Sequence, residues 1–156
     1  MVRTIVATGL AAHAAFACAD VGINLYGASY HFDRDKARER GLTHEVNPGL
    51  GVRWREAGSE RWDVFADAGV YRDSAAHTAK LAGAGALWHA GQHVRLGGAL
   101  VLLKSETYNF GRAFIAPVPL AAYEMRRVTF NLVYFPKWRD VNPTNQIGAW
   151  ITLWLP

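Results

Sequence analysis

The feature that most constrains this chain is a two-residue alternation of apolar and polar side chains, repeated in runs of about ten residues. In the run from 61 to 71, Trp62 and Val64 fall on one face of an extended strand, and Asp63 and Asp67 fall on the other. Successive side chains of a strand point to opposite faces, so this period predicts strands with one apolar face. The predicted strands are Ile23–Phe32, Pro48–Arg55, Arg61–Tyr71, Lys80–Trp88, His93–Leu103, Ala116–Tyr123, Val128–Phe135 and Gln146–Leu155.

The connections between these runs alternate in length. Tight turns are expected at Ala57–Ser59, Ala90–Gln92 and Met125–Arg127, and longer loops at Asp33–Asn47, Asp73–Ala79, Glu106–Ile115 and Lys137–Asn145. In an up-and-down meander, alternate connections lie at the same end, so the tight turns and the long loops are expected at opposite ends. Outer-membrane barrels have this asymmetry, and eight strands is their smallest usual number. The sequence therefore predicts an all-β fold, an eight-stranded antiparallel up-and-down transmembrane β-barrel.

A soluble eight-stranded barrel of the lipocalin type is the main alternative fold. It would share the strand number but invert the alternation, with its apolar face inside. Two observations favour a membrane barrel. The apolar faces carry no charge in mid-strand, and several aromatic residues lie toward strand ends on those faces, as an interfacial belt requires. These aromatic residues are Trp54, Trp62, Trp88 and Tyr134.

The N-terminus has the pattern of a secretory signal peptide. Arg3 supplies a positive charge, Ile5–Phe16 a short apolar run, and Ala17-Cys18-Ala19 a small-residue cleavage site. We therefore expect a signal peptide over 1–19 and a barrel over 20–156, located in the bacterial outer membrane. A segment that stays attached and a lipoprotein lipidated at Cys18 are the alternatives.

Composition excludes several other classes of protein. With 51% hydrophobic and 19% charged residues and a net charge of +4, the chain does not have the composition of a disordered protein. The single cysteine, Cys18, falls in the predicted signal peptide, so the barrel would carry neither a disulfide nor a thiolate metal site. The positive charges form no stripe, which gives little support for nucleic-acid binding. We expect no metal and no soluble cofactor.

The face expected to line the barrel changes character along its height. Near the tight turns it carries charges of both signs, such as Arg53, Asp63 and Asp67, which would pair as a plug rather than form a channel. Toward the long loops the lining becomes apolar and small, with Leu81, Gly83, Gly85, Ala99, Val101 and Leu103. An eight-stranded barrel has room for side chains or for one slim ligand. The glycines would therefore either relieve a bend in the barrel or open a slot for an acyl chain.

Three polar residues are expected to meet at the long-loop rim. His31 ends the first predicted strand, and Asp73 and Ser74 follow the third, which runs in the same direction. Acyl transfer uses these residue types: a histidine takes a proton near neutral pH, a carboxylate orients it, and a hydroxyl attacks or donates. Such residues are also common in solvated loops, so their spacing alone leaves that alternative open.

At these residues the chain resembles the PagP-type lipid A palmitoyltransferases, over nearly all of the mature chain, about residues 24–156. Leu25-Tyr26 with Tyr30-His31 is similar to the family's opening strand and its catalytic histidine, and Tyr71-Arg72-Asp73-Ser74 to its aromatic-basic-Asp-Ser element. Gly85, eleven residues after Ser74, stands at the spacing of the glycine that ends the family's hydrocarbon slot. Pro117–Leu120 and Val128–Pro136 resemble the family's sixth and seventh strands.

The resemblance implies an outer-membrane acyltransferase that moves a palmitoyl-type chain from a phospholipid donor to a hydroxyl of a lipid A acceptor. His31 would be the general base, Asp73 would orient and stabilise the charged imidazole, and Ser74 would be a transient acyl carrier or an oxyanion donor. The acyl slot would be lined by Leu81, Gly83, Gly85, Val101 and Leu103. We expect a membrane-embedded monomer with no nucleic-acid partner.

Four prolines would weaken two seams of the barrel, because proline donates no ladder hydrogen bond. Pro48 would loosen the seam between the first two strands, and Pro117, Pro119 and Pro136 the seam between the sixth and seventh. The family that the chain resembles is understood to admit lipids sideways through such gaps. Ordinary prolines at strand starts are the alternative interpretation.

The chain also departs from the family pattern. Ala84 stands where the family has an aromatic residue two positions before the slot glycine, and the first strand runs two residues shorter near Gly27. Two other functions therefore stay open. One is a non-catalytic lipid-binding, structural or adhesive outer-membrane barrel, and the other is a hydrolase of lipid A or phospholipid that uses water as the acceptor.

Overall fold

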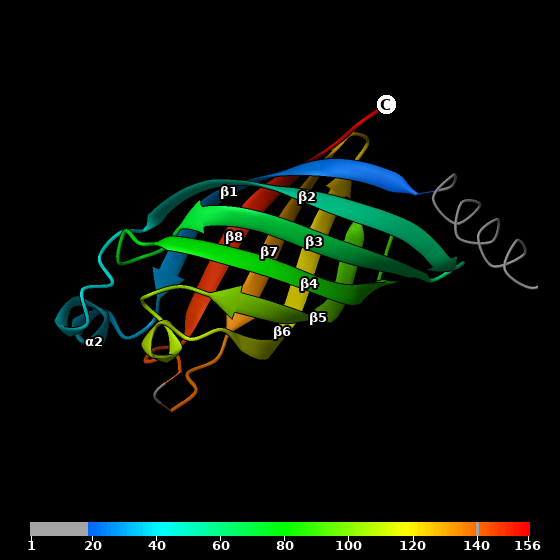
Figure 1. Ribbon diagram of the computed structural model, residues 1–156. Coiled ribbons are helices and arrows are strands. Elements are labelled where there is room, and N and C mark those ends of the chain that lie inside the picture. Colours follow the sequence, from blue (N-terminus) through cyan, green and yellow to red (C-terminus); the bar gives the residue numbers. More distant parts are fainter. Residues whose placement is uncertain (1–18, 140) are drawn as a thin grey trace, which may run out of the picture.

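The structure is a computed structural model that describes residues 19–139 and 141–156. Eight strands form a closed antiparallel barrel in which each strand pairs with the next and β8 pairs with β1 (Figure 1). The strands are β1 (Asp20–His31), β2 (Val46–Ser59), β3 (Trp62–Arg72), β4 (Thr78–His89), β5 (Val94–Lys104), β6 (Phe114–Met125), β7 (Val128–Phe135) and β8 (Gln146–Trp154). The predicted eight-stranded up-and-down barrel is confirmed.

Residues 1–18 of the predicted signal peptide, including Cys18, lie outside the described residues. Within the barrel, β1, β2, β4 and β6 are longer than predicted. β1 begins at Asp20, and β2 runs from Val46 to Ser59, because backbone pairing continues where the apolar alternation lapses. A register shift between Ala57 and Ser59 accommodates the end of β2.

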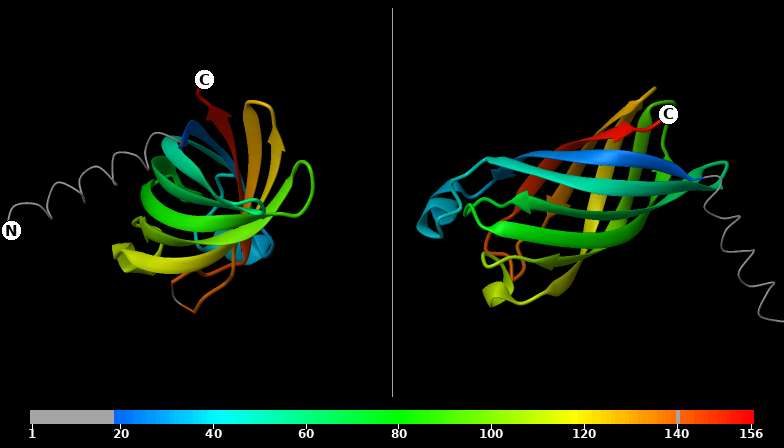
Figure 2. Two further views of the ribbon diagram at one scale, coloured as in Figure 1. Left: turned by 90° about the vertical axis from the view of Figure 1, so that its right-hand side faces the viewer. Right: turned by 45° about the horizontal axis from the view of Figure 1, so that its top comes forward.

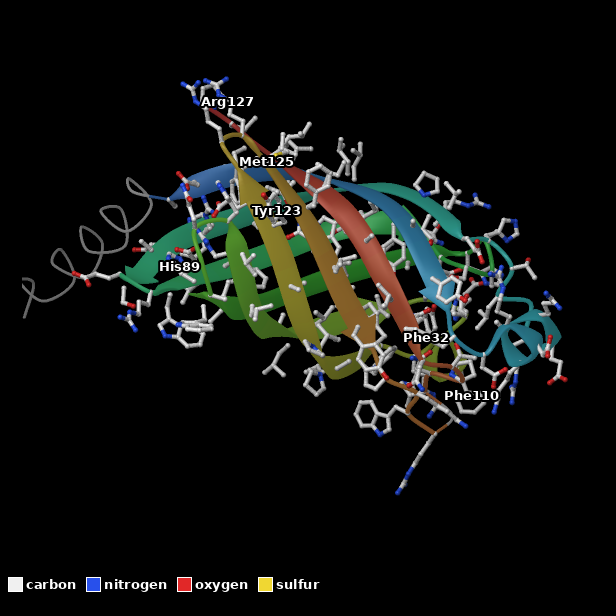
Figure 3. The ribbon with its side chains drawn as sticks, turned by 180° about the vertical axis from the view of Figure 1, so that it is seen from behind. Phe32, His89, Phe110, Tyr123, Met125 and Arg127 are labelled. Atoms are coloured by element: carbon white, nitrogen blue, oxygen red, sulfur yellow. The ribbon has the colours of Figure 1, made fainter. Side chains whose placement is uncertain are left out.

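The two ends of the barrel differ as predicted. The tight turns that join β2 to β3, β4 to β5 and β6 to β7 form one end, here called the turn end. The four longer loops gather at the opposite end, here called the loop end (Figures 1 and 2). Seen from behind, Phe32 and Phe110 lie at the loop end, and His89, Met125 and Arg127 lie at the turn end (Figure 3).

Two short helices at the loop end have no counterpart in the sequence-based prediction. They are α2 (Arg34–Glu39) and η1 (Asn109–Gly111). Asp33 starts α2, because its side chain accepts a hydrogen bond from the backbone amide of Lys36 at 3.1 Å. No helix in the described part of the chain is both long enough and apolar enough to cross a membrane.

The outer surface of the barrel is apolar. Leu50, Leu100 and Ile115 each expose 60% of their surface, on three different strands. Exposed aromatic residues flank this apolar zone at both ends: Trp62 and Trp88 at the turn end, and Tyr30, Phe32 and Tyr134 at the loop end. This is the reverse of a soluble barrel, whose apolar faces point inward.

A network of buried polar side chains fills the interior toward the turn end. Arg53, which is 1% exposed, donates to both carboxylate oxygens of Asp67 at 2.8 and 2.6 Å and to Oδ1 of Asn131 at 2.8 Å. Asn24 and Thr152 complete the network with hydrogen bonds of 2.7 to 3.2 Å. We call these five residues the polar plug. Their mutual hydrogen bonds compensate for the burial of charge, which is costly when unpaired.

Candidate active site

A β-bulge at Gly27 decides which side chains of β1 reach the interior. The ladders of β1 with β2 and with β8 both shift register between Tyr26 and Ala28. Tyr26 faces inward before the bulge, and Ser29 and His31 face inward after it. One extra residue moves the alternation by one position, which turns a strand's side chains to the other face. His31 is therefore buried, at 4% exposure, instead of facing outward.

His31 and Ser74 meet at the loop end, as the strand directions predict. Nε2 of His31 lies 2.9 Å from Oγ of Ser74, and Nδ1 lies 2.7 Å from Oγ1 of Thr144. Ser29 Oγ lies 2.9 Å from Ser74 Oγ. One set of protons satisfies all three bonds: Ser29 donates to Ser74, Ser74 to Nε2, and Nδ1–H to Thr144. Thr144 thus holds the ring nitrogen that the prediction assigned to Asp73.

Asp73 shapes the turn that carries Ser74. It is 1% exposed, and its carboxylate accepts hydrogen bonds from the Ser105 hydroxyl and from the backbone amides of Ala75 and His77, the last two at 3.0 Å. An aspartate that binds its own backbone in this way stabilises a tight turn. In this structure Asp73 therefore acts on the position of the Ser74 hydroxyl through the turn.

Two residues that the sequence analysis did not single out lie beside this site. Burial raises the pKa of Tyr108 to about 12, and the nearby Asp73 carboxylate adds to that increase, so Tyr108 stays a neutral hydroxyl. Its oxygen lies 3.4 Å from both Oε1 and Nε2 of Gln146. Asn47 is 5% exposed, and its Oδ1 has no hydrogen-bond partner among residues 19–139 and 141–156. Both residues line the cavity described next.

The interior on the loop side of the polar plug is hollow. The empty space there, which includes open solvent at the mouth, is about 820 Å³, and Ser29, Asn47 and Ser74 stand in the cavity wall. Three of the predicted slot residues, Leu81, Gly83 and Val101, line it. Apolar side chains supply most of the remaining wall, among them Ala99, Val118, Leu120, Val133 and Trp150.

Leu103 and Gly85, the other two predicted slot residues, lie outside the cavity wall. Leu103 packs with Ala79 and Tyr108 nearer the loop end. Gly85 sits behind Phe65: a Cβ at this glycine would lie 2.7 Å from Cζ of Phe65 and would also press on a backbone carbonyl. Phe65 itself lines the cavity. The Arg53 guanidinium stacks over the Phe65 ring at 4.4 Å from the ring centroid.

The seam between β6 and β7 is paired only in its turn-side part. The ladder joins Leu120–Met125 to Val128–Val133, and Pro117 and Pro119 lie beyond it toward the loop end. A second pocket occupies this region, lined by Pro117 and Pro136 and by Tyr108, Phe135 and Gln146, which also line the main cavity. The two hollows therefore adjoin.

The seam between β1 and β2 is different. Pro48 lies next to the Gly27 bulge, and the ladder resumes beyond it with the pair Ala28 and Val46. This proline therefore coincides with a local irregularity in a seam that is paired on both sides of it.

Several site residues gave a weak signal or none in the sequence. Ser29 lies two positions before His31, and this spacing alone places it on the same face of the strand. Thr144 and Tyr108 lie in loops, where no periodicity exists to read. In the described part of the chain, no group of three or more His, Cys, Asp and Glu side chains could hold a metal ion.

Comparison with protein-family models and with characterised proteins finds no match. Among solved structures, the barrel is similar to Ail, the attachment invasion locus protein of Yersinia pestis, in complex with the heparin analogue sucrose octasulfate. The TM-score is 0.43 with 12% identity, over 88% of this chain and 97% of that chain. The Yersinia pestis outer membrane protein Ail in a phospholipid bilayer nanodisc gives a TM-score of 0.49 with 14% identity, over 87% and 99%. Likeness at this level carries no information on activity.

Proposed function

We propose that this barrel spans an outer membrane and transfers an acyl chain from a phospholipid to a hydroxyl of a lipid A-type acceptor. The observation that carries the proposal is the hydrogen bond between His31 and Ser74 at a hollow, apolar barrel interior. A histidine within 2.9 Å of a serine hydroxyl is the arrangement that activates a nucleophile. The adjoining cavity suits a substrate with a long hydrocarbon tail.

The outer surface supports the membrane-spanning part of the proposal. Its apolar residues are exposed on every side of the barrel wall, and exposed aromatic residues flank them at both ends. Membrane barrels place an apolar band against lipid and aromatic girdles at the two interfaces. In water, such a surface would be a large apolar patch of the kind that soluble monomers avoid.

The cavity supports the acyl-chain part of the proposal. Its wall is almost entirely apolar, as the wall of a site for a hydrocarbon chain is expected to be. A chain that enters from the loop end has its carbonyl near Ser74 and its methyl end near Phe65. Arg53, stacked behind Phe65, stops further penetration because the polar plug is tightly hydrogen-bonded. The depth of Phe65, with Gly85 behind it, would then set the acyl length.

The chemistry follows from the hydrogen-bond chain at Ser74. As Ser74 Oγ attacks the ester carbonyl carbon of the phospholipid, His31 Nε2 takes the serine proton. The bond from the carbonyl carbon to the glycerol oxygen then breaks, and His31 returns the proton to that oxygen, which releases a lysophospholipid. The acceptor hydroxyl attacks acyl-Ser74 in the same manner, and the proton returns to Ser74.

Three neighbouring groups assist in this scheme. The hydroxyls of Ser29 and Tyr108 are donors for the oxyanion that forms during each attack. The free Oδ1 of Asn47 accepts a hydrogen bond from the acceptor hydroxyl. In the alternative direct route, His31 takes the proton of the acceptor hydroxyl and Ser74 is itself an oxyanion donor. Isolation of acyl-Ser74 would distinguish the two routes.

Lipid access is proposed at the β6–β7 seam. Its loop-side part lacks ladder pairs, and the pocket at Pro117 and Pro136 adjoins the main cavity. A phospholipid in the surrounding membrane could therefore insert its chain sideways, without leaving the bilayer.

A non-catalytic lipid-binding barrel is the second candidate, and one observation favours it. The Asp73 carboxylate accepts hydrogen bonds from Ser105 and from its own turn. Nδ1 of His31 is therefore hydrogen-bonded to the Thr144 hydroxyl and not to a carboxylate. A neutral hydroxyl stabilises an imidazolium less than a carboxylate does. On this view the cavity holds a chain and no bond is broken. A hydrolase would use the same site with water as the acceptor.

Product analysis with purified components tests these candidates. The protein in mixed micelles with phospholipid and lipid A should yield lysophospholipid and a heavier lipid A in equal amounts. His31→Ala and Ser74→Ala should abolish both products, and His93→Ala, a histidine at the turn end, should change neither. Free fatty acid without heavier lipid A would instead identify a hydrolase. Unchanged lipids with the wild type would leave only lipid binding.

A further inference from the structure

A cluster of cations lies on the outer wall of the barrel near the loop end. Lys80 of β4 and Lys104 of β5 are directly opposite each other in the ladder, and both are exposed. Their inward neighbours Leu81 and Leu103 line or pack within the interior, so both lysines point outward. Arg72, the exposed last residue of β3, pairs with Thr78 of β4, which lies two residues from Lys80 on the same outer face.

This arrangement is unfavourable without an anion. Residues directly opposite in an antiparallel pair have Cβ atoms about 5 Å apart, and like charges there destabilise the sheet. No hydrogen bond or ion pair joins the side chains of Arg72, Lys80 or Lys104 to any other residue in 19–139 and 141–156. Glu106, close in sequence, has its carboxylate 3.9 Å from Nε2 of His77. Three cations are thus left facing the surroundings.

A shallow apolar groove lies on the same outer wall, directly toward the turn end from the two lysines. It runs over β4, β5 and β6, neighbouring strands in Figure 1, and is lined by Ala84, Ala86, Gly98, Leu100, Pro117 and Pro119. Lys80 and Ala84 are four residues apart on one strand, which places the groove about 13 Å from the cations. The small side chains of Ala84 and Ala86 on β4 make the groove possible, and Leu100, Pro117 and Pro119 form its other side.

We propose that this wall binds a membrane lipid that carries an exposed phosphate monoester, with the phosphate at Lys80, Lys104 and Arg72 and an acyl chain in the groove. A phosphate monoester carries about −1.5 to −2 charges at neutral pH and three strong acceptor oxygens, which match three cations. A zwitterionic phospholipid would bring its own ammonium group into the cluster. The inference rests on the membrane-spanning part of the proposed function and is independent of acyl transfer.

Titration of the full chain, purified from membranes in a nonionic detergent, tests the proposal by native mass spectrometry. The probes are bis-phosphorylated lipid A and the same lipid A stripped of its phosphates. The wild type should retain the phosphorylated lipid preferentially. Lys80→Gln with Lys104→Gln should weaken its binding about 30-fold. Arg126→Gln with Arg127→Gln, which removes the same charge at the turn end, should leave the binding unchanged.

A groove variant and a competitor complete the test. Ala84→Trp fills the groove while keeping the surface apolar, and should weaken the binding of phosphorylated lipid A. Inorganic phosphate at millimolar concentration should not displace the lipid. Equal retention of both probes by the wild type, an unaffected lysine double variant, or full displacement by inorganic phosphate would each overturn the proposal.

Folding and catalysis are separated from binding in the same experiment. The lysine double variant should fold, because it removes a repulsive pair, and heat-dependent gel migration checks this; the two single variants, each with a weaker effect, provide a second test. Binding of phosphorylated lipid A by the wild type without a heavier lipid A product would count against acyl transfer and would leave the lipid-binding proposal intact.

Discussion

The two halves of the barrel interior have opposite contents. Toward the turn end, Arg53 and Asp67 lie at the centre of a buried hydrogen-bond network with Asn24, Asn131 and Thr152. Toward the loop end, an apolar cavity opens beside His31 and Ser74. The same alternating strands build both halves, and only the identity of the inward residues differs.

We infer a different role for each half of the barrel interior. The plug half satisfies its polar groups internally, so it contributes stability and excludes a channel. The hollow half lacks the packing contacts that a filled interior would give, and it holds the groups that the proposed acyl transfer would use. The Phe65 ring, stacked on Arg53, forms the boundary between the two. Substitutions in the hollow half should therefore affect chemistry, and substitutions in the plug half should affect stability.

The largest expected effect is the loss of acyl transfer when a residue at the mouth of the cavity is replaced. His31→Ala should reduce acyl transfer by about 10³-fold or more, because the proton acceptor for the serine is gone. The rate of heavier lipid A formation in mixed micelles measures the effect. The barrel should still migrate as a folded species before heating. Activity within threefold of the wild type would remove His31 from the mechanism.

The double variant Tyr30→His with His31→Tyr should be nearly as severe, because the bulge at Gly27 turns position 31 inward and position 30, which is 43% exposed, outward. Gly27→Ala is the matched control. A Cβ there would meet only the Ala149 carbonyl oxygen, at an ordinary 3.5 Å, so the bulge should persist. Transfer assays on both variants provide the measurement. If the double variant folds and remains active, the bulge does not position the site.

In the plug half, Arg53→Met should lower the free energy of unfolding by about 3–5 kcal/mol, since it leaves the Asp67 carboxylate buried without its partner. The double variant with Asp67→Leu should recover most of that loss. Denaturant titration of the barrel in lipid, followed by tryptophan fluorescence, measures both. A loss below about 1 kcal/mol would show that the plug is not the stabilising half.

The smallest expected effect lies at the boundary. Phe65→Ala should lengthen the preferred acyl chain by deepening the cavity, and Gly85→Ala should shorten it by pressing on the Phe65 ring. Val64→Ala, on the outer face of the same strand, is the control and should change nothing. Mass analysis of products from a mixture of donor chain lengths reads the shift. The same chain-length distribution from Phe65→Ala and the wild type would place the end of the slot elsewhere.

Much of the architecture was predictable from the sequence because a two-residue period reports directly on which face each side chain occupies. The opposite directions of neighbouring strands then sufficed to bring His31 and Ser74 to one rim. The bulge at Gly27 was not predictable, since a single inserted residue leaves the apolar pattern ambiguous. Even so, Ser29 and His31 would lie on the same face of the strand with or without the bulge.

The details of the site could not be predicted as well from the sequence. Thr144 and Tyr108 come from loops, whose paths depend on contacts such as the hydrogen bond from the Asn109 amide to the Val141 carbonyl oxygen. The positions of Phe65 and Gly85 depend on how an inward ring of β3 packs over β4, and spacing along one strand does not contain that information. The carboxylate of Asp73 likewise has Ser105 as a partner, 32 positions away in the sequence.

The most direct test of the central claim is the mass of lipid A from bacteria that lack their own lipid A palmitoyl transfer and express this chain. The account predicts lipid A that is heavier by one acyl chain with the wild type, and lipid A of unchanged mass with Ser74→Ala. Unchanged lipid A with the wild-type barrel folded in the outer membrane would contradict it.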